Sequence, residues 1–217
     1  MRPPSPSLAT MLARKTDDWF RRANSALLSQ IACRPGCSRC CVGLFPITRL
    51  DVHLLQEGLS HLTHDQRQRI ARRAAQQITA LEAAYPSLQS SPSLDGWSDN
   101  DIDEATSAFH DLPCPALGED GLCSLYAHRP LACRSMGIPS RQDGMVNGAC
   151  DVQTFVPIVR LSSSLAAEEE SLAGLEAAAL ATLPEMSSRG EELMLPYGFV
   201  SSGLDGGQDV QGANAGP

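Results

Sequence analysis

Eight cysteines stand in two groups that lie far apart along the chain. The first group is Cys33, Cys37, Cys40 and Cys41, and the second is Cys114, Cys123, Cys133 and Cys150. The first group follows the pattern C-x3-C-x2-C-C, and such short spacings let one loop turn several sulfurs toward a common centre, as thiolate ligation of zinc or iron requires. The sequence therefore predicts that all eight cysteines are metal ligands.

Two other interpretations of the cysteines compete with ligation. Free cysteine packs like a small hydrophobe, but four thiols within nine residues that include Arg34, Pro35, Gly36 and Arg39 do not resemble a core segment. A disulfide framework is typical of small secreted domains, whereas a chain of 217 residues can bury its own core. We favour metal ligation over both.

The number and kind of metal centres stay open at this point. Cys40 and Cys41 are neighbours whose side chains usually diverge, so they could serve two four-cysteine sites or one site with spare thiols. Zinc and iron-sulfur clusters both accept four cysteines, and spacing does not choose between them.

Basic residues stand beside several of the cysteines. A buried set of thiolates needs nearby donors or cations, and Arg34, Arg39, Arg129 and Arg134 could supply them. An equally acceptable interpretation is that they are exposed solubilising residues. Of the five histidines, only His128 lies in a cysteine-rich stretch, and we interpret it as a surface or packing residue rather than a ligand.

The order of the motifs resembles a known family. Cys33 to Cys41 are followed by Cys114-Pro115-Ala116-Leu117, Gly121-Leu122-Cys123-Ser124-Leu125-Tyr126 and Arg129-Pro130-Leu131-Ala132-Cys133-Arg134. This arrangement is similar to the CxxxCxxCC cysteine-cluster family, often called YkgJ-like and described as a zinc- or iron-chelating domain. The resemblance covers Cys33 to about Cys150.

The resemblance implies roles for residues of the second block. We expect Pro115 and Pro130 to fix the loops and Tyr126 to pack over the site. Arg129 is expected to pair with a carboxylate or to face the thiolates. With Arg134 beside Cys133, the predicted residues around the bound group are Arg129, Tyr126 and Arg134.

A similar cysteine domain occurs in flagellin lysine N-methylases, where it is associated with an iron-sulfur cluster. This resemblance favours iron-sulfur over zinc. It does not transfer methylase activity, because the sequence offers no cofactor motif such as a Gly-rich strand-to-helix turn.

Hydrophobic periodicity predicts the elements that must position the cysteines. A helix is expected from Leu8 to Ile31, a second after Pro46 with Thr48 as N-cap, and a third from Thr63 to Tyr85. Gly58 is the weak point of the second helix.

The rest of the chain is expected to contain less regular structure. The residues in 86–103 are rich in Ser, Asp, Asn and Pro and predict a surface excursion, and Cys114 to Cys150 read as loops. Val156 to Leu161 predict a short strand, and Ser164 to Leu183 a helix with Leu175 among its inward residues.

These patterns predict a mainly α fold: a single helical domain with a cysteine-rich, loop-dominated metal-binding region. We divide it into an N-terminal helix (1–32), a cysteine-cluster domain with inserted helices (33–150), a C-terminal helical segment (151–200) and a disordered tail (201–217).

The net charge and the lengths of the apolar runs argue against some classes of function. The net charge of −8 argues against nucleic-acid binding, and no apolar run reaches membrane-spanning or secretory length, so we expect a cytoplasmic protein. The sequence predicts a protein that binds an iron-sulfur cluster or zinc as a binding or electron-transfer module and is not an enzyme. The alternatives are a cluster-dependent enzyme for methyl transfer or redox chemistry, and an interaction protein with a structural zinc.

Overall fold

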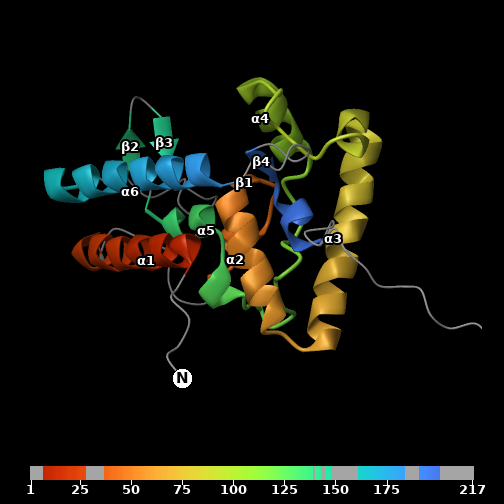
Figure 1. Cartoon of the computed structure of the whole chain (residues 1–217), viewed down its shortest axis with the longest axis horizontal. Helices are drawn as coiled ribbons and strands as arrows, with labels where there is room; N and C mark the ends of the chain where they lie inside the picture. Colours follow the sequence, from red (N-terminus) through yellow and green to blue (C-terminus); the bar gives the residue numbers. More distant parts are fainter. Residues whose placement is uncertain are drawn as a thin grey trace, which may run out of the picture.

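The computed structural model describes residues 7–27, 37–138, 140–142, 145–147, 161–183 and 191–200. Figure 1 shows helices arranged around a central α2, with α1 and α6 on one side and α3 on the other. The elements in chain order are α1 (Leu8–Leu27), η1 (Arg39–Cys41), β1 (Pro46–Thr48), α2 (Arg49–Ser60), α3 (His64–Ala84), η2 (Pro86–Gln89), α4 (Asp99–Ala108), η3 (Tyr126–His128), α5 (Leu131–Ser135), β2 (Ser140–Gln142), β3 (Met145–Asn147), α6 (Ser163–Thr182), β4 (Glu192–Met194) and η5 (Leu195–Phe199). The prediction of a mainly α fold is confirmed.

The long helices form where hydrophobic periodicity predicts them. Thr48 is the N-cap of α2, as expected, and its backbone N–H donates to the Asp51 carboxylate at 3.2 Å. Thr63 caps α3 by accepting from the Gln66 backbone N–H at 3.4 Å, and Gln66 Oε1 accepts from the Thr63 N–H in return. Such reciprocal caps satisfy donors that the first helical turn leaves without partners.

Helix α2 is buried on two sides, which makes it the frame of the fold. Leu50 and Leu54 pack in an apolar cluster with α1, α5 and α6, and Leu55 and Leu59 pack in a second cluster with α3 and η5. Because both faces are apolar, α2 fixes how the two halves of the described molecule meet.

The C-terminal segment before residue 201 completes the larger cluster. Strand β4 pairs antiparallel with β1, and η5 then runs beneath α2 and α3 with all five of its residues buried. Gly198 is needed for this approach, because a Cβ at that position would lie 2.7 Å from Ile47 Cδ1 and 2.8 Å from Leu55 Cδ1. Three-residue strands carry too little pattern to be predicted from the sequence.

The elements differ from the expectations in two places. The excursion predicted for 86–103 contains η2 and the start of α4, because Ser98 and Asp101 form a capping box that begins a helix. Leu175 of α6 is 43 % exposed rather than inward-facing, whereas Ala179 of the same helix is buried. The predicted strand at 156–161 lies almost wholly outside the described residues, as does the tail.

None of the described helices combines the length and apolar character that a membrane span needs.

Candidate metal centre

Six of the eight cysteines lie in the described part of the chain, and all six line one cavity of about 440 Å³. None of the six is in a disulfide, and each is partly exposed. They come from both sequence groups: Cys37, Cys40, Cys41, Cys114, Cys123 and Cys133. Cys33 and Cys150 lie outside the described residues. The fold therefore brings the two groups together.

Backbone hydrogen bonds join the first cysteine loop to the second. The Cys114 N–H donates to the Cys41 carbonyl at 2.7 Å, and the Gly43 N–H donates to the Leu112 carbonyl at 2.8 Å. Gly43 has a φ of +106°, a conformation that residues with a Cβ rarely adopt. This short pairing places Cys41 and Cys114 at the same wall of the cavity.

A tight turn places Cys123 close to Cys114. The Ser124 N–H donates to the Ala116 carbonyl at 2.9 Å, and the Gly118 N–H donates to the Leu122 carbonyl at 2.8 Å. Gly121 closes the turn with a φ of +75°. The turn thus folds the chain back so that both thiols reach the cavity.

Cys133 lies in the short helix α5, which is attached to α2 by Asp51. The Asp51 carboxylate is 2 % exposed, and it accepts from the Leu131 N–H at the start of α5 at 2.6 Å. A carboxylate at a helix N-terminus satisfies a donor that the helix itself leaves open. Burial raises the pKa of Asp51 to about 6.

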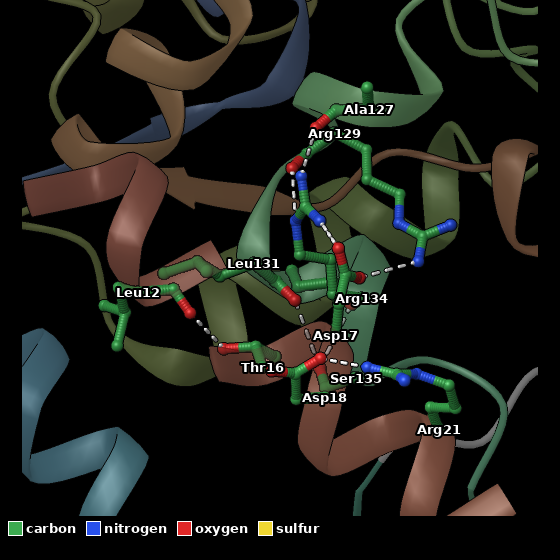
Figure 2. Close-up of polar contacts among 11 residues, drawn as sticks. Leu12, Thr16, Asp17, Asp18, Arg21, Ala127, Arg129, Leu131, Arg134 and Ser135 are labelled. Atoms are coloured by element: carbon green, nitrogen blue, oxygen red, sulfur yellow. Dashed lines mark hydrogen bonds and ion pairs between the residues drawn. The ribbon is translucent and has the colours of Figure 1, made fainter. Parts of the chain in front are cut away.

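An ion-pair network attaches the same segment to α1 (Figure 2). The Asp17 carboxylate pairs with Arg134, whose side chain is 2 % exposed, and with Arg129 at 3.1 Å. Arg134 also donates to the Ala127 carbonyl at 2.7 Å and to the Arg129 carbonyl at 3.0 Å. Arg134 therefore holds the turn before Cys133 by its backbone, a role that the sequence did not indicate.

Tyr126, Arg129 and Arg134, the three residues that the sequence analysis expected around a bound group, all line the cavity. The Arg129 guanidinium stacks over the Tyr126 ring, 4.0 Å from its centre. Arg129 Nε is buried, and it has no hydrogen-bond partner among the described residues. A buried N–H donor beside thiols fits a negatively charged, sulfur-rich group in the cavity.

Among the other described residues singled out from the sequence, only Pro130 also lines the cavity. Arg39 is exposed, and Arg34 lies outside the described residues. His128 is not one of the described residues that line the cavity. Pro115 is buried, and Pro130 precedes the first residue of α5.

Burial and contact give the thiols unequal proton affinities. A hydrogen bond from the Cys41 thiol, opposed by burial and assisted by the Arg129 charge, lowers the pKa of Cys40 to about 6. Burial raises the pKa of Cys114 to about 12 and the pKa of Cys133 well above its ordinary value. A cation bound among these sulfurs would therefore displace protons from most of them.

Apolar residues that the sequence analysis did not single out as site residues form part of the cavity wall. Phe45, just before β1, and Leu55 of α2 contribute to the wall, and Leu195 and Phe199 contribute from η5. Leu195 and Phe199 are brought there by long-range packing of the C-terminal segment, which no local motif encodes. Such a wall lowers the local dielectric and limits water around a bound group.

The cysteine sulfurs are spread around the cavity rather than gathered at one point. Among the described residues, no three cysteines have sulfur atoms that all lie within 4.8 Å of one another. The donor set is thus thiolate-rich but wider than the closed shell of a single ion.

A helical frame that presents six free thiols to one cavity defines a cysteine-rich metal-binding domain. The chain matches the CxxCxxCC family, described as a "putative zinc- or iron-chelating domain", over residues 32–151. The match spans more than half of the chain, which therefore belongs to this family. Comparison with curated proteins and with solved structures finds no match to the chain.

Proposed function

We propose that the cysteines bind an iron-sulfur cluster in the shared cavity and that the protein is a binding or electron-transfer module. The observation that carries the proposal is that six unpaired thiols from two remote segments line one cavity. Thiolate ligation is what zinc and iron-sulfur clusters share, and membership of a chelating family supports it.

The spread of the sulfurs favours a cluster over a single zinc ion. Zinc–sulfur bonds of about 2.3 Å in a tetrahedron place the four sulfurs about 3.8 Å apart. The sulfurs of the described cysteines form no group of three within 4.8 Å. A cluster of several iron atoms has a larger circumference, so its cysteine ligands stand farther apart.

The surroundings of the cavity also suit a negatively charged cluster. Arg129 offers a buried N–H without a described partner, and hydrogen bonds to sulfur are among the features that set a cluster's reduction potential. Apolar residues on the wall would limit access of solvent to the cluster. The proposal requires a compartment in which thiols stay reduced, and we propose the cytoplasm.

A cluster-dependent enzyme is the second candidate, and one observation favours it. The cavity of about 440 Å³ carries aromatic side chains as well as thiols, as a small-molecule site does. An enzyme of this kind needs an iron atom that a substrate can reach. If cyanide changes the electron paramagnetic resonance spectrum of the reduced cluster, an open iron position exists and the enzyme is favoured over the closed module.

Metal analysis with visible absorption on protein purified without oxygen tests the proposal. We expect brown protein with stoichiometric iron and sulfide, and we expect Cys37→Ser and Cys123→Ser each to lower the iron content. Ser124→Ala is the matched control, because Ser124 is exposed and adjoins Cys123. Colourless protein with stoichiometric zinc would overturn the cluster, and full metal content in both cysteine variants would overturn the ligand assignment.

A further inference from the structure

A second group of metal-ligating side chains lies outside the cysteine cavity. Glu57 and His61 stand one turn apart at the end of α2, and His128 lies in η3. Each offers a ligand atom, and the three atoms all lie within 4.8 Å of one another. In the described part of the chain, this is the only group of three or more such side chains that is gathered so closely.

The packing of η3 against α2 creates the group. Gly58 is buried, and a Cβ at this position would lie 2.6 Å from His128 Cβ and 3.0 Å from a Leu125 methyl group. The glycine that looks like a weak point of the helix is therefore what lets His128 approach it. The rings of His61 and His128 lie 5.3 Å apart between centres.

Glu57 is already oriented for ligation. Its Oε2 accepts a hydrogen bond from Thr10 Oγ1 of α1 at 2.9 Å, and its Oε1 lies 4.0 Å from His128 Nε2. A hydrogen bond to one oxygen of a carboxylate fixes the other toward a metal, as partners around metal ligands commonly do. One oxygen is thus held by α1 while the other faces the imidazole.

We propose that Glu57, His61 and His128 bind one zinc ion. Two imidazoles and one carboxylate form a common zinc donor set, with bond lengths of about 2.1 Å that place ligand atoms about 3.4 Å apart. Because the three ligand atoms lie within 4.8 Å of one another, each pair must close by at most about 1.4 Å. His61 is exposed, so the ion has a route of entry and room for a water as fourth ligand.

The site is chemically distinct from the cysteine cavity although the two share a turn. Tyr126 and Arg129, which flank His128 in the sequence, line the cavity. Nitrogen and oxygen donors suit zinc, whereas an all-thiolate set also takes iron-sulfur clusters. Zinc bound to His128 would hold this turn against α2.

Histidine ring nitrogen shifts give a test that reads this site directly. Zinc is titrated into the full chain with its cysteine centre already loaded, and nitrogen-15 spectra of the imidazoles are recorded. We expect the ring nitrogens of His61 and His128 to shift and saturate with one added ion, while those of His53 stay unchanged. Shifts that are equal at all three histidines, or absent at His61 and His128, would overturn the site.

Affinity measurements on two matched variants complete the test. His61→Ala removes an exposed ligand with little risk to folding, and we expect zinc affinity at this site to fall at least about tenfold. His53→Ala removes an exposed histidine of the same helix that is not in the group, and we expect no change. Equal zinc affinity in wild type and His61→Ala would contradict the proposal.

Cobalt separates this site from the thiols. Cobalt added to the loaded protein should give weak visible bands without the ultraviolet charge-transfer band that thiolate ligands produce. A strong thiolate band from the added ion would mean that it enters the cysteine cavity instead, and the proposal would then fail.

Discussion

The apolar core under α2 and α3 differs from the cysteine cavity in what holds the chain. Leu81 and Ile47 in the core are at most 1 % exposed, whereas Tyr126 and Leu122 at the cavity are 59 % and 54 % exposed. The cavity loops are joined by isolated backbone pairs and turns rather than by regular elements. The core can therefore form by burial of apolar surface, while the cavity loops depend on side-chain anchors and a bound group.

A core truncation gives the largest expected effect and should not depend on metal. Leu81 is 0 % exposed, so Leu81→Ala should lower the free energy of unfolding by about 4 kcal/mol in both loaded and metal-free protein. Urea denaturation of the two forms measures this. Leu175→Ala, at a position 43 % exposed, is the control and should cost much less. If Leu81→Ala lowered the free energy of unfolding only in the loaded protein, the core would not be stable independently of the metal centre.

Removal of the metal centre should act on the cavity side alone. A group that binds only the folded chain adds about 2.7 kcal/mol of stability at a concentration of one hundred times its Kd. We expect the loaded protein to be more stable by about this amount, and Cys114→Ser to abolish the difference. Hydrogen exchange should show that the loss is concentrated in residues 37–43 and 112–133. Uniform loss across α3 would show that core and cavity are one unit.

The buried carboxylate between α2 and α5 should make stability depend on pH. The pKa of Asp51 is raised to about 6 from an ordinary value near 3.8, so the folded chain binds its proton more tightly than the unfolded chain. The contribution of the protonated Asp51 carboxyl to the free energy of unfolding is fully present below about pH 4. It is lost as the pH rises through about 6.

Wild type compared with Asp51→Asn isolates this contribution. The stability of wild type relative to the variant should decline between pH 4 and pH 7 by roughly 1–3 kcal/mol, measured by urea denaturation of metal-free protein. Burial and the charge of Asp51 raise the pKa of Glu176 to about 6, so the difference between the two proteins also contains the coupling between these two carboxyls. A difference that is constant with pH would contradict the assignment.

The smallest effects on stability are expected for substitutions of two neighbouring aspartates of α1, Asp17 and Asp18. Asp17 pairs with the buried Arg134, and Asp18 pairs with Arg21, whose side chains are 60 % and 72 % exposed (Figure 2). Because Asp17 is itself 40 % exposed, Asp17→Ala should cost about 1–2 kcal/mol rather than the larger value of a fully buried pair. Asp18→Ala should cost a few tenths. Equal thermal shifts for the two variants would contradict the predicted contrast.

The helices were predictable because each carries its own pattern. The spacing of Leu12, Trp19 and Ala23 predicts one buried stripe, and all three are buried. The start of α4 was missed because Ser98 and its acidic neighbours also suit a turn, and only the reciprocal capping bonds distinguish the two. Periodicity thus succeeds for long elements and fails for those decided by a few hydrogen bonds.

The sequence by itself determined the thiols, their two groups and the helices that flank them, because residue type and local spacing encode these features. Only the tertiary structure decided that both groups face one cavity, that Leu195 and Phe199 contribute to its wall, and that His128 meets Glu57 across Gly58. These contacts join residues far apart in the chain. Their geometry depends on how helices pack against one another, and the pattern within any single helix does not specify that packing.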